Sequence, residues 1–183
     1  MFGNTKASTP KIQKNTALVL QDFEPSMEDR IFIAKYVVGK LNTEDLVQFA
    51  DQKLTDGVYS EHLLNIMDDG PEHWNPVSEY FESFVEEKGY AVPSFEQAVW
   101  VLLRYHILLI SQGNVSPSKQ FRQLLDDIES FDLHKGIKKY VGDNIGIENM
   151  YGWYHSDCST IEETDSGIFN ESLDWVEKFK NEH

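Results

Sequence analysis

The chain has almost no cysteine, no long apolar run and no recognisable catalytic motif. Among its 183 residues, Cys158 is the single cysteine, which excludes an intramolecular disulfide and favours a reducing compartment. The N-terminal segment lacks the apolar core of a secretory signal peptide, so we expect no export signal and a cytoplasmic location. The apolar run at residues 98–110 contains Arg104 and His106 and is shorter than the roughly 20 residues that cross a bilayer, so no membrane span is expected.

Metal and phosphate motifs are missing as well. The sequence contains no HExxH, no pair of CxxC motifs, no calcium loop and no di-iron Glu-x-x-His pair, and residues 142–146 lack the lysine of a phosphate-binding loop. Two loose clusters hold residue types that bind metals, without a diagnostic spacing: Asp68, Asp69, Glu72 and His73, and His155, Asp157 and Cys158. We therefore predict no catalytic residue, no metal and no cofactor, and a metal-dependent hydrolase is the last of three alternatives.

Acidic residues are abundant and are concentrated in two blocks. The net charge is −15, and residues 41–90 contain twelve acidic residues against Lys53 and Lys88. Residues 141–183 contain ten against Lys178 and Lys180, while the rest of the chain is nearly neutral. Such a field repels nucleic acid and anionic lipid and attracts basic partners or metal ions. Solubility alone is the simpler explanation of the same charge, and the sequence leaves both open.

A strongly apolar helix is predicted at residues 94–112. Ser94 and Gln97 form a capping-box pattern, and Gly113 with Pro117 marks the other end. The helix carries apolar side chains on nearly all of its faces, which predicts a buried central position. We expect Arg104 to reach the helix edge and His106 to be a hydrogen-bonded core residue rather than a general base.

Helical periodicity dominates the rest of the chain, and no convincing strand alternation appears. N-caps are predicted at Ser26, Asn42 and Ser60, and Ser116 with Pro117 begins another helix. Residues 133–141 can form a short helix, residues 156–167 read as a loop, and Asn170 is expected to cap the last helix. The fold class is all-α: one irregular helical bundle or solenoid of about seven to nine helices over residues 16–183, after a mobile segment at residues 1–15.

One predicted helix carries an acidic face. Asn75 and Pro76 form a start signal, and the core stripe that follows consists of Val77, Tyr80, Phe81, Phe84 and Val85. Glu79, Glu82 and Glu86 lie within about 60° of one another on the opposite face at roughly 100° per residue. This pattern predicts a ridge of like charge.

Aromatic residues stand beside acids in two places, residues 72–74 and 151–157. Tryptophan and tyrosine flanked by charge are typical of protein interfaces. We expect Trp153 and Trp175 to be core residues, while Trp74 is assigned equally to core and surface.

Two segments, residues 41–51 (LNTEDLVQFAD) and residues 147–154 (IENMYGWY), resemble segments of small bacterial immunity proteins from polymorphic-toxin and contact-dependent inhibition systems. They cover about a tenth of the chain, and no family residue can be transferred by position. The resemblance implies a cytosolic, mostly helical, acidic protein that binds and blocks one cognate toxin domain.

The leading functional hypothesis is a non-enzymatic cytoplasmic inhibitor that occludes a basic toxin domain, with a helical scaffold or adaptor as the second alternative. We expect no nucleic acid and no membrane as partner, and the sequence does not define the oligomeric state. The predicted contact residues are Asp68, Asp69, Glu72, Trp74, Glu79, Glu82 and Glu86.

Overall fold

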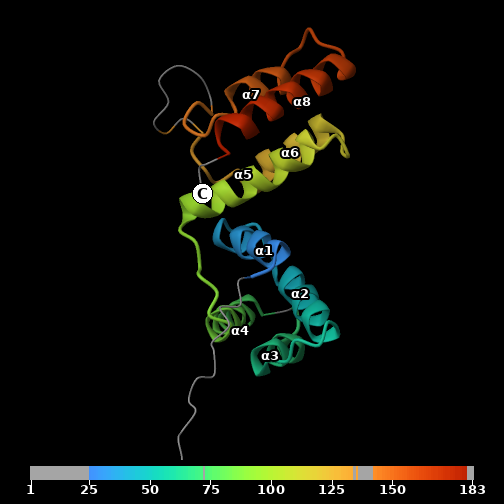
Figure 1. Ribbon diagram of the computed structural model, residues 1–183. Helices are drawn as coiled ribbons and strands as arrows, with labels where there is room; N and C mark the ends of the chain where they lie inside the picture. The colour runs from blue at the N-terminus through green and yellow to red at the C-terminus, as the bar shows by residue number, and fades with distance from the viewer. Residues whose placement is uncertain (1–24, 72, 134, 136–141, 181–183) are drawn as a thin grey trace, which may run out of the picture.

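A computed structural model describes residues 25–71, 73–133, 135 and 142–180 of the chain (Figure 1). These residues form eight α-helices and no strand, which confirms the predicted all-α class. The segment predicted to be mobile, residues 1–15, and most of the short helix predicted at residues 133–141 lie outside the described residues. In chain order the helices are α1 (Met27–Val37), α2 (Thr43–Thr55), α3 (Glu61–Asp69), α4 (Trp74–Glu87), α5 (Phe95–Ser111), α6 (Pro117–Asp127), α7 (Glu148–Tyr154) and α8 (Ile161–Lys178).

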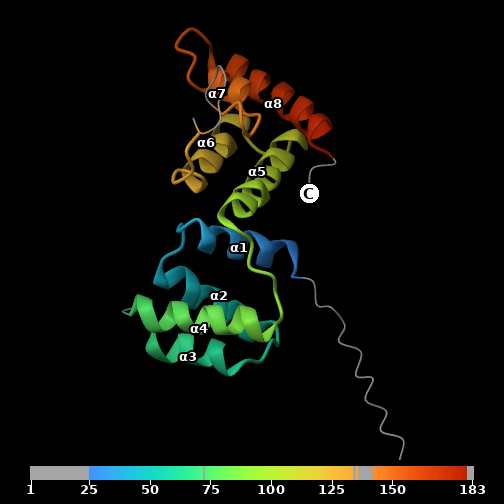
Figure 2. The ribbon, with the colours of Figure 1, turned by 90° about the vertical axis from the view of Figure 1, so that its left-hand side faces the viewer.

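The apolar core consists of two clusters of buried side chains. One gathers residues of α5, α6, α7 and α8, and the other gathers residues of α2, α3 and α4. Helix α1 contributes to both, because Ala34 and the C-cap residue Val38 belong to the first cluster while Ile33 belongs to the second. Figure 2 accordingly shows α1 between the α2–α4 group and the α5–α8 group.

Helix α5 is the centre of the first cluster, as its apolar sequence predicts. The Ser94 hydroxyl accepts a hydrogen bond from the Gln97 amide, and the Gln97 side chain accepts one from the Ser94 amide, so the predicted capping box is present. The helix packs against α1, α6 and α8. The Arg104 guanidinium reaches the end of α8, where it donates to the carbonyl of Phe179 at 2.9 Å.

Two predicted helix starts are wrong. Helix α4 begins at Trp74 with His73 as its cap, two residues before the predicted cap Asn75. Helix α8 begins at Ile161, so part of the predicted loop at residues 156–167 is helical and Asn170 lies inside the helix. Thr160 and Glu163 form a capping box there, which supplies a local start signal although few apolar residues follow it.

The two tryptophans predicted to be core residues differ in the structure. Trp175 is buried, and its indole N–H donates to the Ile145 carbonyl at 3.0 Å. Trp153 is 38% exposed, so its assignment to the core is wrong. Among the described residues, no helix has the length and apolar content to span a membrane.

Candidate functional site

The acidic face of α4 is solvent-exposed. Glu79, Glu82 and Glu86 are exposed, whereas the opposite face of the helix contributes Val77, Phe81, Phe84 and Val85 to the second core cluster. Burial of this apolar stripe fixes the rotation of α4 and therefore turns the three carboxylates outward. Repulsion between like charges at this spacing costs only a few tenths of a kcal/mol, which packing of a helix outweighs.

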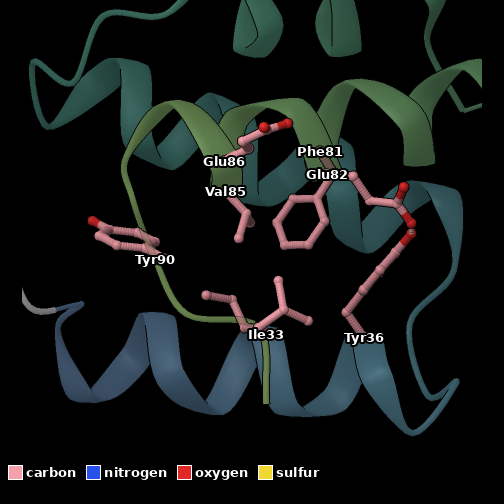
Figure 3. A pocket seen from close by; sticks show the side chains of 8 residues that line it. Ile33, Tyr36, Phe81, Glu82, Val85, Glu86 and Tyr90 are labelled. Carbon is pink, nitrogen blue, oxygen red and sulfur yellow. Dashed lines mark hydrogen bonds between the residues drawn. The ribbon is translucent and has the colours of Figure 1, made fainter. Parts of the chain in front are cut away.

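A pocket of about 380 Å³ lies beside this face, between α1 and α4 (Figure 3). Its lining residues are Ile33, Tyr36, Phe81, Glu82, Val85, Glu86, Tyr90 and Val92. Ile33 and Tyr36 of α1 face Phe81 and Val85 of α4 across the pocket in Figure 3. The wall is thus largely apolar and includes two carboxylates of the acidic face.

The turn after α4 completes the pocket. Gly89 has a φ of 68°, in the left-handed region that favours glycine, and its amide donates to the Glu86 carbonyl. The chain then reverses, and the Tyr90 amide donates to the Val85 carbonyl at 3.0 Å. This turn carries Tyr90 and Val92 to the pocket, where Val92 is 63% exposed and supplies accessible apolar surface.

Tyr36 joins α1 to the acidic face. Its hydroxyl donates to Glu82 Oε1 at 2.6 Å. Burial raises the pKa of Tyr36 well above its usual value, and the hydrogen bond and negative charge of Glu82 raise it further, so the phenol stays a neutral donor. The bond therefore fixes one carboxylate of the face at the edge of the pocket.

Among the described residues, the remaining predicted contact residues lie at the start of α4 and at the end of α3. The Trp74 ring is 40% exposed and lies near the Tyr36 ring, with centroids 6.3 Å apart and planes at 25°. At the end of α3, the carboxylate of Asp69 raises the pKa of Tyr80, the charge of Asp69 being the largest cause. Asp68 is exposed at the same helix end, and Glu72 lies outside the described residues.

The sequence predicted the acidic residues that line this pocket, but not the residues of α1 that line its other side. Ile33 and Tyr36 are more than 40 positions before Phe81, and no local pattern links the two segments. The one available signal was that the α1 segment has apolar side chains on two faces, Ala34 and the C-cap residue Val38 on one and Ile33 on the other. A helix with two apolar faces must pack against two partners.

The side chain of His106, which is expected to lie in the core, is enclosed by hydrogen-bond partners. His106 is 2% exposed, its Nε2 lies 2.9 Å from Asp127 Oδ2, and its Nδ1 lies 2.6 Å from Gln120 Nε2. Asp127 also pairs with Lys35 of α1 at 2.9 Å. Because an amide N–H of Gln120 can only donate, Nδ1 accepts and Nε2–H donates to Asp127. His106 is therefore the buried, hydrogen-bonded core residue that the sequence predicted.

The candidate metal ligands do not converge. Among the described residues, no group of three or more His, Cys, Asp and Glu side chains is arranged to hold a metal ion. The His155 ring contacts the rings of Tyr151 and Tyr154, with centroids at 4.3 and 5.0 Å. Cys158 is an exposed free thiol.

Comparisons of the chain with models of protein families, with curated proteins and with solved structures found no match. The pocket between α1 and α4, with the acidic face beside it, is therefore assessed on its own geometry and charge.

Proposed function

We propose that this chain is a non-enzymatic binding protein that recognises a basic protein partner through the α1–α4 pocket and the acidic face of α4. The observation that carries the proposal is the combination of an accessible apolar pocket with Glu82 and Glu86 in its wall. An apolar side chain of the partner would enter the pocket. Lysine or arginine residues beside that side chain would meet the carboxylates.

The size of the pocket agrees with such an anchor. Its volume of about 380 Å³ lies at the lower end of the range of about 300–1,000 Å³ typical of ligand pockets. Trp74 and Tyr36 extend the contact area next to it, and such aromatic residues are enriched at the energetic centre of protein interfaces. The polar residues around them would form the rim of the interface.

The charge of the chain supports the same partner class. The α2–α4 region carries most of the acidic block at residues 41–90, so a basic domain would be attracted over distances near the Debye length of about 8–10 Å. Steering of this kind raises the association rate more than it changes the final affinity.

Within this class we favour an inhibitor of a basic toxin domain, as the resemblance to immunity proteins implies. The experiment co-expresses the chain with the product of the reading frame that neighbours its gene and measures growth of the bacterial host. The inhibitor proposal expects that product to stop growth alone and the chain to restore growth. A neighbouring product that binds the chain without being toxic would instead identify an adaptor.

The contact surface is tested by two double charge reversals with the same change in net charge. Glu79→Lys with Glu86→Lys changes the acidic face, whereas Asp51→Lys with Asp174→Lys changes exposed acids elsewhere, which form no ion pair within the part of the chain that the structure describes. The first pair should slow association with the partner about tenfold at low salt and flatten its salt dependence. The second pair should have a much smaller effect. Equal effects of the two pairs would show that the acidic face only provides bulk charge.

The apolar anchor has its own variant. Val92→Asn removes exposed apolar surface at the pocket without disturbing the core, because Val92 is already largely in solvent. We expect about tenfold weaker binding with an unchanged association rate, since loss of a buried apolar contact acts mainly on dissociation. Unchanged dissociation would place the interface away from the pocket.

A further inference from the structure

A second aromatic surface lies between α7 and α8, which run side by side in Figures 1 and 2. Gly167 of α8 is buried, and a Cβ atom added to it would lie 2.3 Å from Cδ2 of Trp153. The indole of Trp153 therefore lies directly on the α8 backbone at the one residue without a side chain. With 38% of the residue still exposed, the ring is both fixed in place and accessible.

Two shallow hollows adjoin the Trp153 ring. The first, of about 360 Å³, is lined by Glu162 and Glu163 from the first turn of α8. The second, of about 400 Å³, is lined by Glu148 of α7 and Glu171 of α8. Trp153 is common to both, so acidic side chains flank this indole in two hollows.

The four carboxylates are not neutralised by cations of the described residues, because none of them forms an ion pair there. Glu163 accepts from the Thr160 amide, and Glu171 accepts from the Asn149 side chain at 3.0 Å. Glu148 Oε2 is buried and has no hydrogen-bond partner among the described residues. The exposed Glu162 and Glu163 thus leave negative charge and acceptor oxygens for a ligand, whereas the buried Oε2 of Glu148 is not accessible to it.

We propose that the Trp153 surface is a binding site for an arginine-bearing segment of a protein, with the guanidinium stacked on the indole and its N–H groups directed to the flanking glutamates. Tryptophan is the side chain that attracts cations most strongly through its ring face. Arginine fits better than lysine because its planar guanidinium stacks on a ring and donates in a fork to a carboxylate. The site is separate from the α1–α4 pocket and does not depend on it.

The test titrates ¹⁵N-labelled full-length protein with a blocked Gly-Arg-Gly-Arg-Gly peptide and follows the Trp153 indole N–H signal by NMR. The signal is assigned by triple-resonance experiments, so its assignment does not require a tryptophan variant. We expect a saturable shift of this signal that is at least several-fold larger than with the matching lysine peptide. The matching glutamate peptide should cause none.

Variants distinguish specific binding at the Trp153 surface from attraction by the overall negative charge of the protein. Glu162→Gln with Glu171→Gln keeps the acceptor oxygen for Asn149 and should weaken binding of the arginine peptide about three- to tenfold. Glu79→Lys with Glu86→Lys should leave the Trp153 response nearly unchanged, so failure of the α1–α4 proposal is distinguishable from failure of this one. An equal Trp153 response to the lysine peptide or to Mg²⁺, or a shift that does not saturate, would overturn the proposal.

Discussion

The contact between Trp153 and Gly167 gives the sharpest prediction about stability. Gly167→Ala places a methyl group 2.3–2.7 Å from three ring atoms of Trp153, far inside the 3.5–4.0 Å at which carbon atoms make favourable contact. The ring must leave the α8 surface. If about 100 Å² of apolar surface returns to water, the cost is about 2.5 kcal/mol.

Helix propensity acts in the opposite direction. Replacing a helical glycine by alanine stabilises a helix by about 0.5–1 kcal/mol. The net effect of Gly167→Ala should therefore be a loss of about 1.5–2 kcal/mol in the free energy of unfolding, because the steric cost exceeds the gain in helix propensity. Gly152 of α7 is the matched control, because a Cβ there has no atom within 4 Å. Gly152→Ala should stabilise the protein by about 0.5 kcal/mol.

Thermal unfolding measures both variants. For a protein of this size, Gly167→Ala should lower Tm by about 3–8 °C while Gly152→Ala raises it slightly. In a Trp153→Ala background the alanine at position 167 has room, so Gly167→Ala should then be neutral or stabilising. If both glycine variants stabilise the wild-type protein equally, Trp153 does not lie on Gly167 and the geometry of the second surface is wrong.

Two further predictions concern the core network and the start of α5. Asp127→Ala leaves Lys35 and the Nε2–H of His106 without their acceptor and should lower the free energy of unfolding by about 2 kcal/mol, measured by urea denaturation. Burial acts to raise the pKa of Asp127, but the hydrogen bonds and charges of His106 and Lys35 outweigh it and leave this pKa below its usual value. The difference in free energy of unfolding between wild type and Asp127→Ala should therefore be constant above the unfolded-state pKa of about 3.9. It should shrink as the pH falls through the lower folded-state pKa of Asp127. A difference that stays constant down to the acid transition would contradict this. Ser94→Ala should cost about 1 kcal/mol because the hydroxyl caps α5. Ser116→Ala removes no capping bond of α6 and only a long 3.5 Å hydrogen bond to Asp165, so it should cost less than about 0.5 kcal/mol in the same assay; equal losses would refute the capping argument.

Local signals predicted much of the helical framework. The caps at Ser26, Asn42, Ser60 and Ser94 are present as the sequence indicated, since a cap needs only a side chain and amides two or three positions later. The acidic face of α4 was predictable for a similar reason. One helical repeat relates Glu79, Glu82 and Glu86 to the apolar stripe on the other side.

The start of α8 shows where the prediction overlooked a local signal. Residues 156–167 contain few apolar side chains, and the loop prediction rested on this scarcity without considering the Thr160–Glu163 capping box. The helix does not need a broad apolar stripe at that end. The backbone at Gly167 packs directly against the ring of Trp153. Because glycine has no side chain, this contact leaves no apolar pattern in the sequence.

The sequence by itself determined the all-α class, the buried α5, the core position of His106 and the outward acids of α4, because caps and helical periodicity act within one or two turns. Only the tertiary structure decided that Ile33 and Tyr36 face α4 and that Trp153 stays at the surface while Trp175 is buried. Those outcomes depend on contacts between segments far apart in the chain, such as Tyr36 with Glu82. The sequence therefore predicts the acidic face of α4 as a row of like charges. The packing of α1 next to α4 forms the apolar pocket beside this face, and the pocket and the face together are the candidate binding site.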